Sequence, residues 1–193
     1  DAQESRGLGD VYKRQLSYDV RQLGISRLAA AREILTTNSR RLTVTHPTKG
    51  SKKAKRIVVV SAMHRISPNT YRQLREPHLA IEYGIGKIRV TPILIPDETA
   101  CLGCRDLWET ENHPDWTSTA IQLASRKDNL DDGAGLLFAV SMATKSICQY
   151  VDTGFGSVTE GFQVSLKNRA VSLFSWQRHP ACQCLLTNRQ PIR

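Results

Sequence analysis

In the stretch TACLGCRDLW, residues 99–108, Cys101 and Cys104 form a CxxC pair. Near the other end of the chain, the stretch RHPACQC, residues 178–184, holds Cys182 and Cys184 as a CxC pair. A tight turn directs both sulfurs of such a pair the same way, and tetrahedral zinc takes four soft ligands from two short elements. The spacing predicts a fold that brings both pairs together around one zinc ion.

Other roles for these cysteines have to be weighed against the metal site. A redox CxxC opens a helix in a thioredoxin-like context, and it would leave the CxC pair unexplained. A nucleophilic cysteine needs a base, for which His113 or His179 could serve, and His179 could also replace one thiolate. Four unconnected buried cysteines do not explain two close pairs. We therefore expect Cys101, Cys104, Cys182 and Cys184 to be structural zinc ligands, with no catalytic and no cofactor-binding residue assigned.

The composition is that of an ordinary globular domain. The chain has 193 residues, of which 40% are hydrophobic and 23% charged. No apolar run in the sequence reaches the roughly 20 residues of a membrane helix, and the polar N-terminus is no secretory signal. Five cysteines without an export signal suggest a reducing compartment. These features predict a cytoplasmic protein that does not interact with membranes.

The first 15 residues are treated apart from the rest. The run GLGDVYKRQ is typical of translated sequencing-adaptor DNA, and we exclude residues 1–15 from the fold on that ground. The alternative is a solvated polar arm. Residues 16–193 are then expected to be the C-terminal portion of a single domain whose upstream part is missing.

Positive charge is concentrated in the first part of the chain. The net charge is +9, and residues 16–75 hold 13 Lys and Arg against Asp19 and Glu33. Such a segment could attract an acidic partner, or it could be a solvated surface. No aromatic residues alternate with the basic loop and no nucleic-acid-binding motif accompanies it, so we expect no nucleic-acid partner.

The residue pattern predicts an α/β domain with three layers and a mainly parallel sheet. Ser26 is a plausible cap for a helix over residues 26–39, and the run 56–60 is typical of a strand buried on both faces. Ser67 and Pro68 predict the start of another helix, over residues 67–76. The remaining strands of this part are expected at residues 41–45, 78–84 and 87–95.

The second half is expected to hold a core helix and a hairpin. Residues 136–151 are apolar almost all round, which indicates a buried helix, and Cys148 within it is interpreted as a small buried apolar residue. Residues 161–176 alternate on both sides of a KNR turn. This hairpin delivers the chain to the CxC pair and would close the zinc site.

Longer motifs around the cysteines resemble the ThiF/MoeB-like family, the fold of ubiquitin-activating enzymes. They are closest to the ThiF-like partner proteins of thiazole/oxazole-modified microcin clusters. The resemblance covers about residues 16–193 and implies a partial Rossmann-like fold. Asp97 and His113 depart from the pattern, which usually has glycine and aspartate there. The motifs are PILIPD (92–97), CLGCRDL (101–107), HPDW (113–116), QLA (122–124) and HPACQC (179–184).

The resemblance implies two possible roles. ThiF/MoeB enzymes use ATP and magnesium to adenylate the C-terminus of a ubiquitin-like small protein. Members of the microcin subgroup bind the leader of a precursor peptide and present it to a YcaO-type cyclodehydratase, which makes azolines in bacteriocin-like peptides. The resemblance also allows a homodimer.

One absence in the sequence favours the second role. Adenylating members carry an aspartate just after the strand near residues 58–60, where it holds Mg-ATP. Here no Asp or Glu occurs from Ile34 to Arg75, and His64 is a poor ligand for a hard cation such as Mg²⁺. We therefore expect a scaffold subunit without catalytic activity of its own. The alternatives are an ATP-dependent adenylyltransferase and a zinc-stabilised binding module for an acidic partner.

Overall fold

The structure is a computed structural model that describes residues 22, 24–38, 56–84, 86–126, 133–154, 160–168 and 170–185. The chain divides into two compact units, Asp1–Ala54 and Lys55–Arg193, which are taken separately here. The expectations for residues 1–15, for the strand at 41–45 and for most of the basic loop lie outside the described residues.

The described part of the first unit is mainly one helix, α2, which spans Arg27–Asn38. The Oγ atom of Ser26 accepts a hydrogen bond from the backbone N–H of Ala29 at 3.2 Å. Such a bond satisfies one of the free donors at a helix start. The predicted helix and its cap are confirmed.

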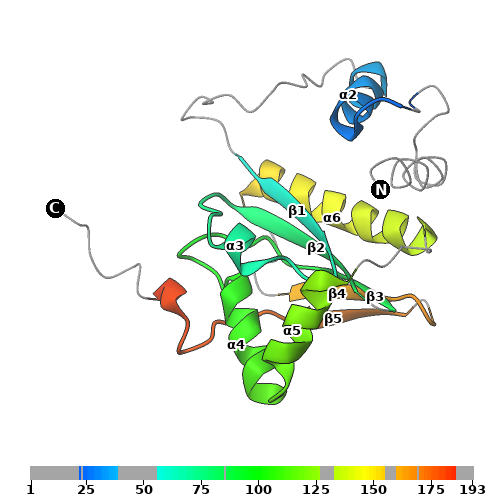
Figure 1. The fold of residues 1–193 in the computed structure, drawn as a ribbon. Coiled ribbons are helices and arrows are strands. Elements are labelled where there is room, and N and C mark those ends of the chain that lie inside the picture. The colour runs from blue at the N-terminus through cyan, green and yellow to red at the C-terminus, as the bar shows by residue number, and fades with distance from the viewer. Residues whose placement is uncertain are drawn as a thin grey trace. The chain divides into compact units, whose positions relative to one another are not determined.

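The second unit is a five-stranded sheet with helices on both faces (Figure 1). The strands lie in chain order, β1-β2-β3-β4-β5. They span Val58–Met63 (β1), His78–Gly84 (β2), Lys87–Val90 (β3), Glu160–Ser165 (β4) and Val171–Ser175 (β5). The helices span Pro68–Tyr71 (α3), Leu102–Asn112 (α4), Trp116–Ser125 (α5) and Gly133–Thr153 (α6), and Gln183–Leu185 forms a 3-10 turn (η2).

The mixed direction of the strands corrects one prediction. β1 and β2 are parallel, whereas β2–β3, β3–β4 and β4–β5 are antiparallel. Strands joined by two-residue connections, such as β2 and β3, can only be antiparallel. The domain is α/β as expected, but a mainly parallel sheet is wrong for the described strands.

Each face of the sheet carries its own apolar core. One core joins residues of β2, β3 and β4 to Ala139 and Ala143 of α6. The other joins Ala80 of β2 to Leu102 and Cys104 of α4 and to Trp176. Alternation along β2 divides the strand between the two cores, because successive side chains point to opposite faces. The sheet therefore lies between α6 and the helix that begins at the first cysteine pair.

Three predicted elements differ in extent from those found. β1 is an edge strand of the described sheet, and the exposed fraction of Val59 is 48%, so burial on both faces is wrong. Helix α3 is a single turn, although Ser67 caps it and Pro68 begins it as expected. β3 ends at Val90, and the hydroxyl of Thr91 then accepts the N–H of Ala80 at 2.9 Å.

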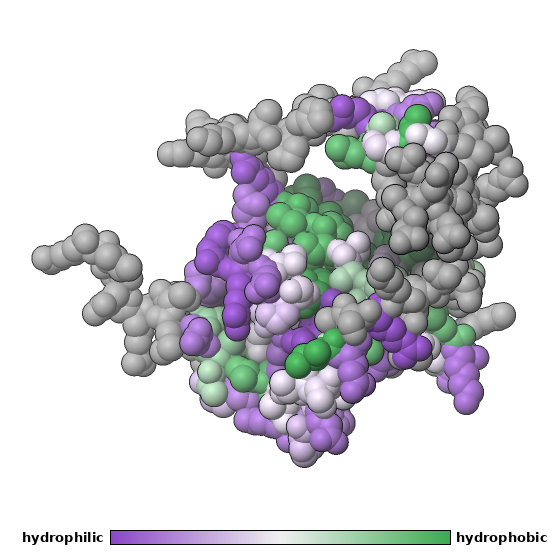
Figure 2. All heavy atoms as spheres, in the orientation of Figure 1, coloured by the Kyte–Doolittle hydropathy of each residue, from purple (hydrophilic) through white to green (hydrophobic). Residues whose placement is uncertain are grey.

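Helix α6 is longer and less enclosed than predicted. Its outer face leaves several large apolar side chains exposed, and Cys148 is exposed rather than buried. Figure 2 shows apolar atoms gathered where Figure 1 draws β1 and α6. Among the described residues, the stretch Ala134–Thr153 is long and apolar enough to cross a membrane by length and composition, a test that core helices also pass. Ala139 and Ala143, packed on the sheet, are typical of a helix within a folded domain.

The predicted hairpin is confirmed as β4 and β5, with a turn at residues 166–168. Gly161 of β4 lies opposite Phe174 of β5. A Cβ atom on Gly161 would lie 2.4 Å from the ring of Phe174 and 2.6 Å from the carbonyl oxygen of Val90. The aromatic ring therefore covers the strand where a side chain is missing.

We expect Gly161→Ala to destabilise the protein by about 1–3 kcal/mol, the usual cost of overpacking a core. One of the two contacts is with backbone, which cannot rotate away. Chemical denaturation measures the change. Gly84→Ala is a matched control, because the nearest atom to its would-be Cβ is 3.4 Å away, an ordinary van der Waals contact. Equal stability of Gly161→Ala and the wild type would contradict the close packing.

Candidate metal centre

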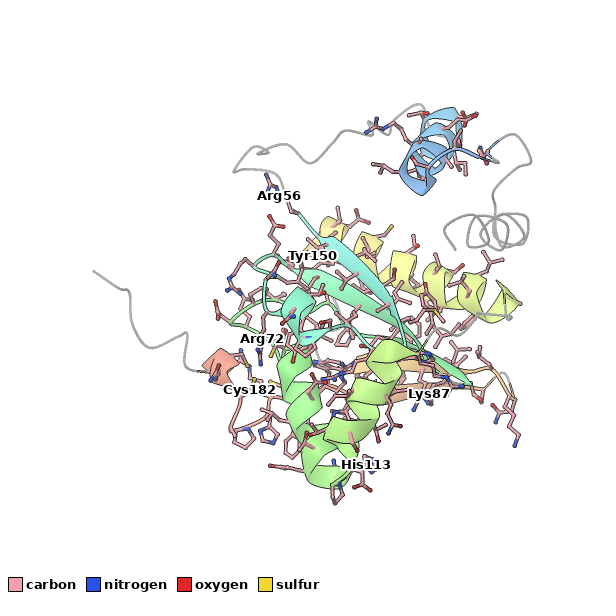
Figure 3. The ribbon with its side chains drawn as sticks, in the orientation of Figure 1. Arg56, Arg72, Lys87, His113, Tyr150 and Cys182 are labelled. Atoms are coloured by element: carbon pink, nitrogen blue, oxygen red, sulfur yellow. The ribbon has the colours of Figure 1, made fainter. Side chains whose placement is uncertain are left out.

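The four cysteines of the two pairs come together at one end of α4. Their sulfur atoms all lie within 4.8 Å of one another, with Cys104 and Cys182 buried. The cluster lies beside the start of α4, whereas His113 marks the far end of that helix (Figure 3). The two pairs thus meet, as the spacing predicted: the fold joins residues that are about 80 positions apart.

Local structure explains why each pair can present two sulfurs. Cys101 has extended backbone angles and is the residue from which α4 starts, and the N–H of Cys104 donates to its carbonyl at 3.1 Å. In the second pair, the N–H of Cys182 donates to the carbonyl of His179 at 3.0 Å, and η2 follows. One pair thus lies on a helix start and the other on a short turn, the two kinds of element that form zinc knuckles.

The sulfur separations suit a metal site and not a disulfide. The Sγ atoms of Cys101 and Cys182 are 3.6 Å apart, those of Cys104 and Cys184 are 3.4 Å apart, and those of Cys101 and Cys104 are 3.8 Å apart. Disulfide sulfurs are about 2.05 Å apart. Tetrahedral zinc with bonds of about 2.3 Å places its ligand sulfurs about 3.8 Å apart. The cluster could therefore hold a metal ion with little movement.

Without a cation, deprotonation of one of the four thiols disfavours deprotonation of the others. The S–H of Cys101 donates to Cys104, and this hydrogen bond lowers the pKa of Cys104 well below its ordinary value. Burial raises the pKa of Cys184, and the contact with Cys104 raises it further. Like charges so close together cannot all ionise. A divalent cation would remove this conflict by stabilising every thiolate at once.

Side-chain hydrogen bonds beside the cluster connect the end of the hairpin with α4 and with the loop that precedes it. Trp176 donates its indole N–H to the carbonyl of Ala100 at 3.2 Å, and Trp108 donates to the carbonyl of Gln177 at 3.3 Å. Arg178 donates to the carbonyl of Asp97 at 2.6 Å. Asp97 has a φ of +65°, the left-handed conformation that glycine favours and aspartate tolerates. Aspartate in place of the usual glycine of the motif therefore still allows the same turn.

His179 is a structural residue of this region. Its ring is almost fully buried, 4.6 Å from that of Trp108 in an edge-on arrangement. Its Nδ1 accepts the N–H of Ala181 at 3.1 Å, and its Nε2 lies 2.9 Å from a carboxylate oxygen of Glu111. These contacts join the CxC turn to α4. They match the expectation of a hydrogen-bonding histidine, and His179 is not part of the group of four cysteines that could hold a metal ion.

We expect His179→Ala to weaken metal retention by about 10–100-fold, the usual effect of losing a group that orients ligands. The affinity is measured by competition with a chelator of known strength. His113→Ala is the matched control, because the His113 side chain is 67% exposed. An unchanged affinity in His179→Ala would show that the turn holds its shape without the ring.

The structure bears on the two chemical alternatives for the cysteines. The CxxC pair does open a helix, so its setting is closer to that of a redox pair than the sequence suggested. The second cysteine pair within the same cluster still has no part in such chemistry. For a nucleophile, His113 stands at the end of α4, about 18 Å along the helix from Cys101 at 1.5 Å per residue. A metal centre remains the arrangement that uses all four sulfurs.

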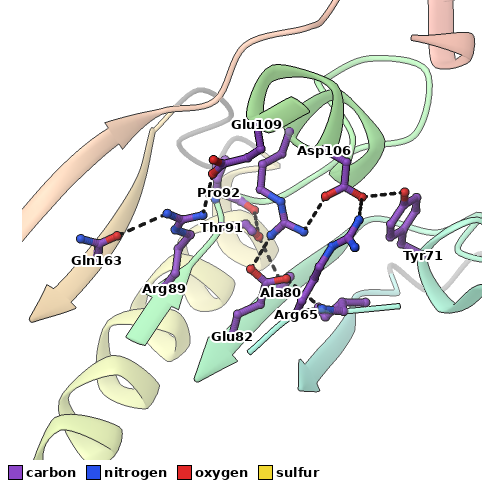
Figure 4. A network of polar contacts seen from close by, with 12 residues as sticks. Arg65, Tyr71, Ala80, Glu82, Arg89, Thr91, Pro92, Asp106, Glu109 and Gln163 are labelled. Atoms are coloured by element: carbon purple, nitrogen blue, oxygen red, sulfur yellow. Dashed lines mark hydrogen bonds and ion pairs between the residues drawn. The ribbon is translucent and has the colours of Figure 1, made fainter. Parts of the chain in front are cut away.

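A buried network of charges lies next to the cluster on the same helix (Figure 4). Arg105 donates to Glu82 of β2 and, at 3.2 Å, to Asp106. Asp106 also accepts from Arg65 and, at 2.8 Å, from the hydroxyl of Tyr71. Burial raises the pKa of Tyr71, and the neighbouring Asp106 raises it further. The network joins the segment after β1, α3, β2 and α4 around the residues that follow the CxxC pair.

Two cavities flank α4, and sequence reasoning did not find them. The first has a volume of about 580 Å³ and lies beyond the carboxyl ends of β1 and β2, where His64, Glu82, Arg105 and Trp116 are among its lining residues. The second, of about 400 Å³, lies between α4 and the end of β5. The buried charge network described above did leave one signal in the sequence. Glu82 is a lone acid in an apolar strand, and a buried charge needs a partner.

Comparison with known proteins shows the fold. No family model and no curated protein matches the chain. Among solved structures, Escherichia coli MccB with AMPCPP and MccA matches with a TM-score of 0.65 and 14% identity, over 90% of this chain and 54% of that one. The microcin C7 biosynthetic enzyme MccB with N-formylated MccA matches with a TM-score of 0.63 and 14% identity, over 90% and 56%. The E. coli microcin synthetase McbBCD complex matches with a TM-score of 0.53 and 14% identity, over 79% and 62%.

These likenesses extend over most of the chain but not over most of its neighbours. The chain spans about half the length of the MccB structures that it matches. At such identities the comparison concerns the arrangement of the backbone and not the activity. The chain therefore has the fold of part of MccB, a fold that also occurs in the microcin synthetase McbBCD complex.

Proposed function

We propose that the protein is a non-catalytic scaffold subunit that binds a precursor peptide and assembles a YcaO-type cyclodehydratase in the biosynthesis of an azole-containing peptide. The fold supports this proposal, because the neighbours include a microcin synthetase complex and the microcin C7 biosynthetic enzyme MccB in complex with N-formylated MccA. The cysteine motifs that resemble the ThiF-like microcin partner proteins support it from the sequence side.

The observation that carries the scaffold role is that, in the described part of the chain, no acidic residue directly follows β1. His64 and Arg65 follow the strand there. The buried acids nearby already accept hydrogen bonds from protein groups. Glu82 accepts from the N–H of Ile66 at 3.0 Å and from Arg105. Asp106 accepts from Arg65, from Arg105 and from the hydroxyl of Tyr71. Magnesium needs carboxylate oxygens that are free to coordinate it. This setting favours a subunit that does not process Mg-ATP.

Cys101, Cys104, Cys182 and Cys184 would hold the metal in this proposal, and we assign it as zinc. Four thiolates fill a tetrahedral zinc ion completely, so the metal would stabilise the fold without binding water or substrate. It would join the start of α4 to the end of the hairpin. The chemistry of the complex would then belong to the cyclodehydratase partner.

An ATP-dependent adenylyltransferase is the second candidate, and one observation favours it. The cavity of about 580 Å³ lies beyond the carboxyl ends of β1 and β2, the edge where α/β sheets usually bind ligands. MccB, whose fold is similar, has been solved with ATP. This role needs a nucleotide to bind in the cavity, where Arg65, Lys87 and Arg89 among the lining residues would attract its phosphates.

Measurements of binding and of activity separate the candidates. The scaffold role predicts that genes for a precursor peptide and a YcaO protein lie beside this one, that the purified chain binds both products, and that it increases azoline formation by the YcaO enzyme. ATP–pyrophosphate exchange by the protein alone, dependent on a small acceptor protein, would establish the adenylyltransferase instead. Binding to acidic peptides regardless of sequence, with no effect on the YcaO enzyme, would favour a simple binding module for an acidic partner.

A further inference from the structure

The last strand of the sheet has an open edge with unusual composition. β5 pairs with β4 only, and it ends the order of the described strands. Its sequence, VSLFS, contains no charge and no proline. Val171 is 47% exposed and Leu173 is 68% exposed. Proteins usually protect such edges with charges, proline or bulges, because an unprotected edge recruits another strand.

The register tells which backbone groups face outward. The N–H of Ser165 donates to the carbonyl of Ala170 at 2.8 Å, so this opposite pair exchanges hydrogen bonds. Bonded and non-bonded pairs alternate along an antiparallel ladder. The peptide groups of Val171, Leu173 and Ser175 are therefore directed away from β4, toward the open edge.

A cavity lies beside the end of this strand. It has a volume of about 400 Å³, and its lining includes Phe174, Ser175 and Trp176 from the strand end and Trp108 from α4. The aromatic walls suit an apolar side chain. Arg89, Arg105 and Glu109 also line it, but Arg89 pairs with Glu109 at 3.5 Å and Arg105 pairs with Glu82, so these charges do not select an acidic or a basic occupant. The other edge, β1, contributes no residue to either of the two cavities.

We infer that the open edge of β5 binds an extended peptide as an added strand, with one aromatic or large aliphatic side chain in the cavity beside Trp108 and Trp176. Main-chain hydrogen bonds would provide affinity and the cavity would provide specificity, as in other cases of strand addition. This inference rests on the proposed peptide-binding role and gives it a location.

The geometry favours a peptide over a second copy of the chain. If two copies of the chain paired symmetrically through β5, the side chain that enters the cavity of one copy would have to come from β5 of the other copy. Phe174 already packs against Trp176 at 5.7 Å and lies under Arg89 at 5.4 Å, so it is not available to fill a neighbour's cavity. A separate peptide can instead supply a side chain that does not already pack within its own fold.

Leu173→Pro is the test, with Leu173→Ala as its matched control. Proline removes an N–H that faces the open edge and leaves the β4–β5 ladder intact, since edge strands tolerate proline at such positions. Alanine removes the same side chain and keeps the N–H. The probe is a displayed library of random 12-residue peptides, selected on the wild-type protein and then synthesised.

The expected result is that selected peptides alternate β-forming residues with an aromatic one. They should bind wild type and Leu173→Ala within about threefold of each other, and Leu173→Pro at least tenfold more weakly. Circular dichroism and the unfolding midpoint confirm that both variants fold. Equal binding to Leu173→Pro, or no selectable peptide, would overturn the inference. So would a wild-type dimer in sedimentation that Leu173→Pro dissociates, because a second copy would then occupy the edge.

The outcome separates this inference from the proposed function. If the precursor peptide and the YcaO enzyme bind wild type and Leu173→Pro alike, the scaffold role stands and the β5 edge is not its peptide site. If library peptides need the edge but the YcaO enzyme does not respond to the protein, the edge site stands and the scaffold role fails.

Discussion

Replacing Cys104 by serine is expected to abolish metal binding and to remove most of the stability of the second unit. Cys104 is fully buried, and its sulfur lies within hydrogen-bonding distance of those of Cys101 and Cys184. Structural zinc supplies on the order of 10 kcal/mol of apparent free energy, as much as the whole stability of a typical domain, about 5–15 kcal/mol. The loss would therefore exceed what the two apolar cores can offset.

The measurement has two parts. Elemental analysis of the purified wild type should give one zinc per chain, and Cys104→Ser should give none. Thermal unfolding should show a cooperative transition that is lost in the variant. Cys148→Ser is the matched control, because Cys148 is exposed on α6 outside the cluster. It should keep both the metal and the transition.

A variant that fails to fold does not leave the metal centre unexamined. The wild type can be titrated with a chelator, and metal release and unfolding should then follow the same curve, since binding and folding are coupled in such sites. A wild type that stays folded without metal would contradict a stabilising zinc ion. A Cys104→Ser protein with a full equivalent of zinc would contradict the ligand set.

The cysteine cluster was predictable because its signal lies in local spacing. Two close cysteine pairs constrain the fold whatever lies between them, and the alternating residues 161–176 predict the hairpin that carries the second pair. The direction of the strands was not predictable in the same way. A continuous apolar run such as residues 56–60 looks alike in a parallel and in a mixed sheet, and burial depends on neighbours that the local pattern does not contain.

The buried network was missed for a related reason. Glu82 and Arg105 are 23 positions apart, and only the fold shows that they meet. In the sequence, Arg105 and Asp106 look like surface charges at the start of a helix. For Cys148 the prediction was wrong in the opposite direction, because it expected burial and the residue is exposed. The apolar sequence of the helix suggested burial on all sides, whereas in the described residues α6 packs through only one face. Motifs thus located the four clustered cysteines, and tertiary packing decided their surroundings.

Arg105→Ala is expected to destabilise the protein by about 3–5 kcal/mol, the usual cost of breaking a buried ion pair. The side chains of Arg105 and Glu82 are 8% and 5% exposed, and Asp106 beside them is 13% exposed. Removing the guanidinium leaves two carboxylates in the interior with one fewer cation. The desolvation of Glu82 then has no compensation except the N–H of Ile66.

Urea denaturation measures the effect, with Arg56→Ala as the control. Arg56 pairs with Glu76, but both side chains are 42% exposed, and exposed pairs contribute about 0–1 kcal/mol. The double variant Arg105→Met with Glu82→Leu removes both charges and should recover much of the loss, because an apolar pair of similar volume often replaces a buried ion pair without penalty. Loss in the single variant with recovery in the double one would assign the cost to the unpaired carboxylate. A loss that persists in the double variant would show instead that Arg105 acts through its packing over Trp176 at 5.8 Å.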